Sequence, residues 1–432
     1  MHVVYQYKLL PTAAQVKEMS AWLDMLRAQY NWLLGERFDW WQFNRCPVNA
    51  CPLTCSIASV KERPSFYGQK RSLPALKRER PWYKRVHSQV LQEMVKRVEV
   101  TFDRFLGGDS RGKRSGRPRF KSPSRYRTFT FPQMKPGSVQ GNRVTFPKLG
   151  AVKFICHRPL PDGFVLKRAE VTRKADGWYV GLTLKDTRVP EPLAVEAVPT
   201  ETNSIGIDVG LEYFVACSDG TTVTPPQFFR RAQAKLSRLQ AKRELRAKGS
   251  TARRKLTSRI ARVHQTIARQ RRQWQFELAG QLVEKAEVVF VENLKVSNMS
   301  RRCRPKVADD GSYLPNGQAA KSGLNKSFAD AGIAGFLDTI LPYKAEKAGR
   351  RVVQVNPAGT SQHCAKCLHR VPKKLSERWH ECPECGYSVA RDINSAVLIQ
   401  QVGWLGVVLT QKRESGSKTR RRSPRRIAPQ SA

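Results

Sequence analysis

The alternation of apolar and polar side chains divides the first half of the chain into helical and strand-forming parts. Residues 2–9 alternate with a period of two, which predicts a β-strand. Residues 13–43 and 85–106 instead repeat their apolar side chains three and four positions apart, which predicts two amphipathic helices. Between them, four prolines interrupt any regular pattern in residues 44–80. From 127 to 189 the period is again two, in short runs that turn residues separate. We therefore expect a small barrel or sandwich, which the strand at residues 2–9 could complete.

The pattern of the second half predicts an α/β sheet. Residues 204–225 are typical of two or three hairpin-linked strands with Asp219-Gly220 as a turn, and Gly249-Ser250 divides a long helical stretch into two antiparallel helices. The remaining expected elements are buried strands at 286–294 and 350–357, a polar irregular segment at 300–327, and helices at 328–349 and from about Arg391. This order of elements indicates a sheet of mixed strand directions covered by helices.

The charge of the chain is the first guide to its chemistry. The 432 residues include 78 Lys and Arg against 35 Asp and Glu, a formal net charge of +43. Such an excess repels itself unless a polyanion neutralises it, so most enzymes of small molecules are excluded and nucleic acid is the expected partner. Residues 230–272 contain sixteen Lys or Arg and one acid, Glu244, so ion pairing within a solvated helix pair cannot explain them. The candidate phosphate contacts in this stretch are Arg230, Arg231, Arg253 and Arg254.

The rest of the composition narrows the class of protein. Hydrophobic residues make up 40% of the chain, which is enough for folded cores. No apolar run approaches the roughly 20 residues of a membrane span, and the first residues lack the pattern of a secretory signal, so we expect no membrane partner and a cytoplasmic, nucleoid-associated protein. Residues 107–127 form either a phosphate-contacting loop or a solvated linker, and the basic tail 411–432 is expected to be disordered.

The ten cysteines are clustered, which points to metal sites rather than to a disulfide framework. Two Cys-x-x-Cys pairs lie fourteen residues apart near the carboxyl end, and each pair turns two thiolates toward one point. Four thiolates make a closed tetrahedral zinc site, which is structural because no position is left for a substrate. The expected zinc ligands are Cys364, Cys367, Cys382 and Cys385.

Three carboxylates are candidates for a second, catalytic metal site. Asp208 ends an apolar strand in Ile-Gly-Ile-Asp, Glu292 ends the strand Val-Val-Phe-Val-Glu, and Asp392 lies at the start of the last helix. An acid at the end of a buried strand is costly unless it is paired or binds a cation. Three such acids could hold two Mg²⁺ ions for phosphodiester hydrolysis. The spacing alone leaves the alternative that Asp208 forms a turn and Asp392 caps a helix.

A third group of possible ligands lies in the first half. Cys46, Cys51 and Cys55 could bind a metal together with His87, although packing within a loop is the commoner fate of such residues.

At this point the sequence resembles the TnpB family, transposon-encoded nucleases that are regarded as ancestors of the type V CRISPR effectors. The resemblance covers about residues 2–405. It rests on an ordered series of motifs, namely YKLLPTAAQ, VLQEMVKRVEVTFDRF, GRPRFK, YRTFTF, PKLG, GIDVG, VVFVENL, the paired Cys-x-x-Cys motifs and RDINSAV. Each motif alone is weak, but together and in this order they are highly specific.

The resemblance implies an RNA-guided DNA endonuclease that serves the transposon. It implies a RuvC-like nuclease in which Asp208, Glu292 and Asp392 match the three catalytic acids, with two catalytic Mg²⁺ ions and one structural Zn²⁺. Its partners would be a guide RNA from the transposon end and double-stranded target DNA, which is cut beside a short transposon-associated motif. Base pairing would supply the sequence specificity while the protein grips the backbone. The family comparison suggests three candidate motif contacts, Gln92, Thr128 and Thr130.

The implied fold is multidomain α+β, a small wedge-like β-barrel with an inserted helical domain followed by an RNase H-like (RuvC) domain with an inserted zinc ribbon. The expected divisions are a barrel at 1–10 and 125–190, a helical recognition domain at 11–124, a nuclease domain at 200–358 and 388–410, a zinc ribbon at 359–387, and the tail at 411–432.

The sequence departs from the family pattern at Ala390, where Asp is common, at Leu368, where Gly is usual after the first Cys-x-x-Cys pair, and in a longer segment at 44–84. None of these changes removes a catalytic acid, so we expect an active enzyme. Two other hypotheses remain: a nucleic-acid-binding regulator or accessory transposition protein that does not cut, and a transposase that transfers strands. The chain order Asp, Glu, Asp favours the nuclease over the transposase.

Overall fold

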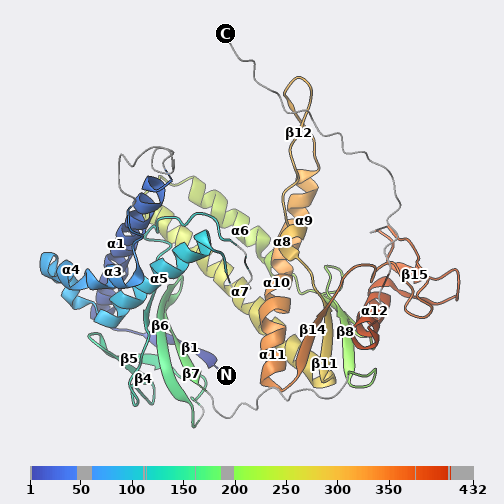
Figure 1. Cartoon of the computed structure of the whole chain (residues 1–432), viewed down its shortest axis with the longest axis horizontal. Helices are drawn as coiled ribbons and strands as arrows, with labels where there is room; N and C mark the ends of the chain where they lie inside the picture. Colours follow the sequence, from blue (N-terminus) through green and yellow to red (C-terminus); the bar gives the residue numbers. More distant parts are fainter. Residues whose placement is uncertain are drawn as a thin grey trace. The chain divides into compact units, whose positions relative to one another are not determined.

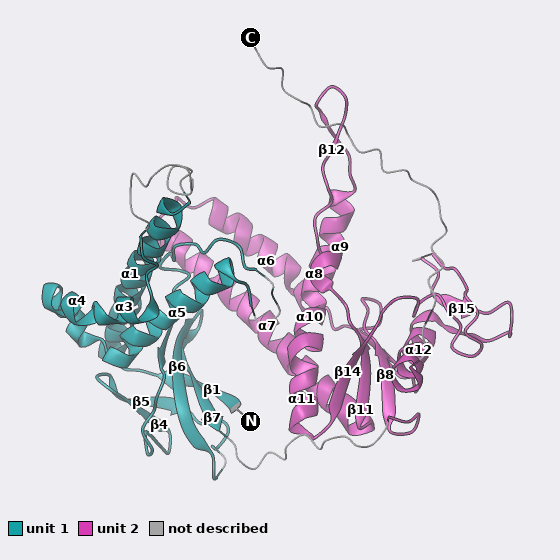
Figure 2. Ribbon diagram, in the orientation of Figure 1, with its two compact units in different colours: residues 1–189 teal, residues 190–432 magenta. Residues whose placement is uncertain are grey.

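The computed structural model describes residues 2–45, 61–109, 112, 114–160, 162–185, 199–374, 376–406 and 409. The chain divides into two compact units, residues 1–189 and residues 190–432 (Figure 2). Each unit has its own hydrophobic core. No helix among the described residues combines the length and the apolar character that a membrane crossing requires.

The first unit is built on one curled antiparallel sheet. Its described strands are β1 (His2–Leu10), β2 (Thr128–Phe131), β3 (Val139–Gln140), β4 (Arg143–Phe146), β5 (Gly150–Ile155), β6 (Val165–Lys174) and β7 (Gly177–Lys185). They lie in the order β2-β6-β7-β1-β5-β4-β3. The first strand pairs with β7 on one side, where Val4 lies opposite Thr183, and with β5 on the other, where Leu9 lies opposite Phe154. The prediction that residues 2–9 complete the sheet is confirmed, and among the described strands one sheet replaces the expected sandwich.

Helices between β1 and β2 pack on this sheet. They are α1 (Ala13–Phe43), α3 (Phe66–Arg71), α4 (Leu73–Glu79), the 3₁₀ helix η1 (Pro81–Arg85) and α5 (Ser88–Leu106). Helix α1 begins where predicted because Thr12 and Gln15 form a capping box, each side chain accepting from the other's backbone N–H. The fully buried Trp22 of α1 contacts Phe129 of β2, with ring centroids 5.5 Å apart. The helices and the sheet therefore share one core.

The sheet of the second unit has five described strands in the order β10-β9-β8-β11-β14. They are β8 (Ser204–Asp208), β9 (Val215–Cys217), β10 (Thr222–Val223), β11 (Val288–Glu292) and β14 (Arg351–Val355). The central strand β11 is parallel to both β8 and β14. Strand β9 pairs antiparallel with β8, and β10 pairs antiparallel with β9, so the predicted mixed sheet is confirmed. Val289 and Val291 face one core and Val288 and Phe290 the other, which explains the uninterrupted apolar run.

The basic stretch forms the expected pair of helices, α6 (Phe228–Glu244) and α7 (Thr251–Lys285), which pack side by side (Figure 1). Gly249 adopts a left-handed φ of 87°, and the hydroxyl of Ser250 caps α7 by accepting from the backbone N–H of Arg253. Few apolar side chains hold the pair together, among them Leu236 and Ile260.

The segment that follows β11 differs from the prediction. Its elements are α8 (Val296–Met299), the hairpin β12 (Lys306–Val307) and β13 (Tyr313–Leu314), α9 (Gln318–Ala331), α10 (Ile333–Gly335), the π-helical turn η2 (Phe336–Ile340) and α11 (Leu341–Lys347). Residues 318–327 were expected to be irregular and are helical. This prediction was wrong because α9 buries only Asp330 and Ala331 at its end, so the apolar periodicity that marks a helix is missing.

The last elements are the hairpin of β15 (Trp379–Glu381) and β16 (Ser388–Ala390) and helix α12 (Arg391–Leu405). Helix α12 packs directly on β8 and β11, and two glycines allow this close approach. A Cβ atom at Gly206 would lie 2.0 Å from the carbonyl oxygen of Ala396, and one at Gly403 would lie 2.2 Å from the ring of Phe290. This contact brings the start of α12 to the strand ends that carry the candidate acids.

Candidate active site and metal centre

The structure brings the three predicted carboxylates together at one edge of the buried sheet. Asp208 and Glu292 are the last residues of β8 and β11, which are adjacent parallel strands with Ile207 opposite Val291. Asp392 lies in the first turn of α12, which packs on β8. Parallel strands end at the same edge of a sheet, so side chains far apart in the sequence meet here.

Burial makes this cluster of acids electrostatically costly. Burial raises the pKa of Asp208 well above its usual range, and the nearby carboxylates of Glu292 and Asp392 raise it further, against the opposing charge of Arg391. Burial also raises the pKa values of Glu292 and Asp392. A bound cation would remove this cost by neutralising the charges, so the donor set fits a metal that prefers carboxylate oxygens.

The four cysteines form a compact group of potential metal ligands in the part of the chain that the structure describes. Their donor atoms all lie within 4.8 Å of one another. The three acids are not part of that group, so the fit of the carboxylate site to a cation rests on the chemistry and the burial of its oxygens.

Thr360 orients one of the acids and was not predicted from the sequence. Its hydroxyl lies 2.5 Å from Oε1 of Glu292, to which it donates, and the side chain is 1% exposed. This hydrogen bond favours the charged form of Glu292 and so opposes the effect of burial on its pKa. Nothing in the sequence distinguishes this threonine in the polar loop after β14 from an ordinary loop residue.

The predicted zinc ligands converge as the spacing requires. The sulfurs of Cys364 and Cys385 are 3.6 Å apart and those of Cys367 and Cys382 are 3.5 Å apart. Tetrahedral zinc with Zn–S bonds near 2.3 Å needs sulfurs about 3.8 Å apart, so the four thiols could bind a zinc. Burial opposes ionisation of Cys382, but the backbone N–H groups of Cys385 and Glu384 outweigh it and lower the pKa of this thiol to about 6.

The residues after the two Cys-x-x-Cys pairs explain one departure from the family pattern. Gly386 follows the second pair with a φ of 68°, and Leu368 follows the first with a φ of 59°. Both are left-handed conformations, which glycine adopts without strain and leucine does not. The usual glycine therefore has a physical reason, and this chain places a leucine in a strained position.

Asn394 connects the cysteine cluster to the carboxylate site and was also missed. It is fully buried on α12, two residues after Asp392. Its side chain accepts from the N–H of Ala365 at 2.9 Å and donates to the carbonyl of His363 at 2.8 Å, on either side of the ligand Cys364. The segment that carries the first pair of cysteines is therefore bonded to the helix that carries the third acid.

A second connection runs across the rim of the site. The side chain of Arg378, from the cysteine-rich segment, forms an ion pair with Glu212, from the loop after β8, at 2.8 Å. The charges of both side chains affect the pKa of Asp392: the positive charge of Arg378 lowers it and the negative charge of Glu212 raises it. Ala390 lies at the N-cap of α12 and offers no side-chain cap, whereas an Asp there would satisfy a free N–H of the helix.

The predicted phosphate contacts in the helix pair are not equivalent. Arg231 and Arg254 are exposed, and Arg230 donates to the hydroxyl of Ser327 at 3.1 Å. Arg253 instead donates to the carbonyls of Arg243 and Arg246 and pairs with Glu244, all within 3.0 Å. The Arg253 side chain therefore closes the turn between α6 and α7, which weakens its case as a phosphate contact.

The predicted motif contacts also differ from one another. Gln92 and Thr128 are half-buried, and the hydroxyl of Thr128 lies 3.2 Å from that of Thr172. Thr130 is 2% exposed and lies among core side chains, so a contact with DNA would require local movement of β2, and its role stays a prediction. Residues 128 and 130 share a face of β2, and burial increases from the first residue of the strand inward.

Other predictions fall partly outside the described residues. Cys46, Cys51 and Cys55 and the tail 411–432 lie outside them. His87, their proposed fellow ligand, is half-buried, and burial lowers the pKa of its imidazole.

Three family models match the chain. Residues 184–302 match one described as a probable transposase, residues 335–399 one described as a Cas12f1-like TNB domain, and residues 1–46 one described as a helix-turn-helix domain. In the structure residues 2–45 form a strand and one long helix.

Curated relatives match most of the chain. An Escherichia coli protein named "Putative RNA-guided DNA endonuclease InsQ" is 30% identical over 339 residues, 78% of this chain and 80% of the relative. A Streptomyces pristinaespiralis protein named "Putative RNA-guided DNA endonuclease" is 28% identical over 405 residues, 92% of this chain and 89% of the relative.

Among solved structures, a Cas12f1–sgRNA–target DNA complex matches 93% of this chain and 99% of its own, at 15% identity and a TM-score of 0.32. The mini-RNA-guided endonuclease CRISPR-Cas_phi3 matches 62% of this chain and 58% of its own, at 13% identity and a TM-score of 0.37. At such TM-scores the fold of this chain is judged from its own topology.

Proposed function

The chain belongs to the TnpB family of transposon-encoded, RNA-guided nucleases, and we propose that it cuts double-stranded DNA beside a short transposon-associated motif under the direction of a guide RNA. The observation that carries this proposal is the convergence of Asp208, Glu292 and Asp392 at one edge of the buried sheet. A regulator that only binds nucleic acid has no use for three acids whose charges cost stability when they are buried together.

In the proposed mechanism the three acids hold two Mg²⁺ ions. When bound, the ions would supply an activated water and stabilise the leaving oxygen of the phosphodiester. Asp208 would lose its proton when the cations bind, and Thr360 holds the side chain of Glu292 in place through its hydroxyl. The edge of the sheet keeps these oxygens in place before DNA arrives, which reduces the cost of ordering them in the reaction.

We propose that the second unit is an RNase H-like (RuvC) domain with a zinc ribbon inserted between β14 and α12. The support is the central parallel strands, the helices on both faces, and four cysteines located between the strand and the helix that carries Asp392. Zinc at Cys364, Cys367, Cys382 and Cys385 would be structural, because four thiolates leave no open position.

For the first unit we propose a wedge-like barrel with an inserted helical recognition domain, in the divisions given above. The insertion of α1 to α5 between two strands of one sheet supports it. Gln92 and Thr128 remain candidate motif contacts. The exposed bases of α6 and α7, including Arg231 and Arg254, are proposed to follow the backbone of the guide RNA or its duplex with DNA.

The experiment that tests guided function is sequencing of the RNA that co-purifies with the full chain. We expect a discrete RNA that ends in a variable segment complementary to the cut DNA. Random cellular RNA would contradict the proposal, because charge alone would then explain the binding. If the complex bound target DNA in Mg²⁺ and left it uncut, the non-cutting regulator would be the better description.

A further inference from the structure

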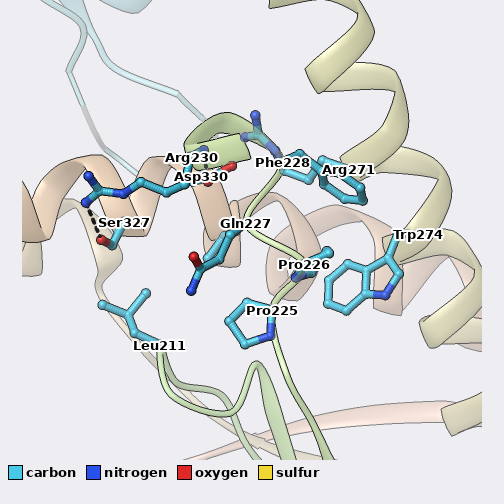
Figure 3. Close-up of a pocket in the computed structure, with 11 residues that line it drawn as sticks. Leu211, Pro225, Pro226, Gln227, Phe228, Arg230, Arg271, Trp274, Ser327 and Asp330 are labelled. Carbon is cyan, nitrogen blue, oxygen red and sulfur yellow. Dashed lines mark hydrogen bonds between the residues drawn. The ribbon is translucent and has the colours of Figure 1, made fainter. Parts of the chain in front are cut away.

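A cavity of about 280 Å³ lies in the second unit, outside the carboxylate cluster (Figure 3). It is lined by the start of α6, the middle of α7, the end of α9 and the loop after β8. Leu211 of that loop is three residues from Asp208, and three residues span at most roughly 11 Å. The cavity is therefore close enough to the candidate catalytic acids to contact a strand bound there.

One wall of the cavity is flat and rigid. The indole of Trp274 is fixed against the fully buried Phe214, with ring centroids 4.8 Å apart and planes at 68°. Beside it, Pro225 and Pro226 form a stiff linker between β10 and α6 (Figure 3). Flat apolar walls of this kind suit a planar ring.

The polar groups in the cavity have unused hydrogen-bonding capacity. Gln227 is exposed, and its side-chain amide forms no hydrogen bond with a described residue, so it is available to a ligand without breaking a contact within the protein. The Nε–H of Arg271 is shielded from solvent and has no acceptor in the described part of the chain, although its Nη1 donates to the carbonyl of Ala329 at 2.6 Å. Buried donors in folded proteins are nearly always paired with protein or water, so this donor is available to an acceptor atom in the cavity.

The backbone at Gln227 is itself unusual. Its φ of 51° and ψ of 45° are left-handed, a conformation that a residue other than glycine adopts only under constraint. Such outliers persist where the surrounding structure holds them, and they gather at ligand sites. Figure 3 shows the Gln227 side chain between Leu211 and the two prolines, inside the ring of lining residues.

The charge of the cavity favours a nucleotide. Its one acid, Asp330, is held by hydrogen bonds, because its carboxylate accepts from the backbone N–H groups of Phe229 at 2.8 Å and Arg230 at 3.1 Å. The guanidinium groups of Arg230 and Arg271 outnumber this one carboxylate, which leaves a positive excess in the lining. The volume lies just below the roughly 300–1,000 Å³ of typical small-molecule sites, which leaves room for one ring system.

We propose that this cavity receives one unstacked nucleobase of the DNA strand that carries the scissile phosphate. The base would stack on Trp274, and the amide of Gln227 would hydrogen-bond its edge. Stacking on an aromatic side chain offsets the loss of stacking in the strand. The bound base would fix the register of the strand relative to Asp208. This inference rests on the proposed nuclease function.

The test is abasic scanning of the target DNA with the full chain and its guide RNA. Binding is measured with the non-cutting Asp208→Ala complex, and cutting with the wild-type complex. We expect one position near the cut at which loss of the base weakens binding about tenfold, the size of one stacked base. Gln227→Leu and Trp274→Phe should each reduce that difference, and both keep the side chain large enough to preserve the fold.

The matched control is Gln240→Leu, an exposed glutamine on α6 outside the cavity, which should leave the abasic profile unchanged. A flat binding profile overturns the pocket even if wild-type protein cuts intact DNA normally. A dependence on abasic sites in the guide RNA in place of the DNA also overturns it. Failure of the wild-type complex to cut intact DNA would contradict the proposed function instead. The binding profile would still show whether the cavity receives a base.

Discussion

The two candidate metal sites of the second unit are built in opposite ways. The four cysteines come from 22 consecutive residues, Cys364 to Cys385, and their sulfurs lie within 4.8 Å of one another. The three acids come from strands and a helix spread between Asp208 and Asp392. One site is local and closed by four thiolates, whereas the other depends on the register of the sheet and on the packing of α12.

The difference indicates that one site of this unit stabilises the fold, whereas the other is suited to catalysis and lowers stability. A closed thiolate site contributes folding energy to a segment too small for its own core. The carboxylate site lowers the stability of the metal-free protein, since burial and mutual repulsion raise the pKa of Asp208. The hydrogen bonds of Asn394 tie the stabilising site to the helix that carries one acid of the costly site.

The largest expected effect is that of Asp208→Asn. The change removes the central negative charge, so DNA cutting should fall below detection while guide RNA binding persists. The metal-free variant should also be more stable than the wild type, with the midpoint of thermal unfolding rising by about 2–4 °C for each kcal/mol of charge burial relieved. Cutting assays and calorimetry in a chelating buffer measure the two effects.

The sign of the stability effect follows from the direction of the pKa shift. Asp208 has a higher pKa in the folded protein than in the unfolded chain, so the unfolded chain releases its proton first as the pH rises. Stability of the metal-free wild type therefore falls as the pH rises from the unfolded pKa through the folded one, and Asp208→Asn should reduce this loss. An equally steep loss in the variant would show that Asp208 is not buried with the other acids.

The next largest effect is expected at the cysteine cluster. Cys382→Ser should abolish stoichiometric zinc binding and unfold the segment around the four ligands. Cutting should fall with it because Asn394 would lose its partners at His363 and Ala365. Zinc content by atomic absorption and protease sensitivity of residues 359–387 test this, and full cutting without zinc would show that the two sites are independent.

Much of this organisation could be predicted because its signals are local. Helix α1 follows from apolar periodicity, strand β11 from an uninterrupted apolar run, and the cysteine cluster from two short motifs. The acids could be recognised singly at strand ends, but their meeting depends on the register of β8 with β11 and on the packing of α12. Thr360 and the polar helix α9 carry no periodic or motif signal, so only the three-dimensional structure reveals them.

A smaller effect is expected from Thr360→Val, which keeps the shape of the side chain and removes its hydroxyl. Loss of a hydrogen bond to a metal ligand typically costs roughly 10–100-fold in metal affinity or activity. The Mg²⁺ concentration for half-maximal cutting should therefore rise. Thr360→Ser is the matched control because it restores the donor, and an unchanged Mg²⁺ requirement in the valine variant would contradict this role.

The smallest effect is expected from Arg378→Ala, which breaks the exposed ion pair with Glu212 between the two sites. Exposed pairs contribute about 0–1 kcal/mol, so unfolding stability should change by no more than that. The readout is chemical denaturation at low and high salt. A loss of several kcal/mol would show that this pair, and not Asn394, is the main connection.

The central claim is that three carboxylates from one sheet edge perform guided DNA cutting. It is tested by incubating the purified RNA complex, with and without Mg²⁺, with a plasmid that carries a sequence matching its guide. We predict linear product only with the matching sequence and Mg²⁺, and none from the Asp208→Ala complex, which should still bind the plasmid. Cutting by Asp208→Ala, or binding without cutting by the wild type, would contradict the account.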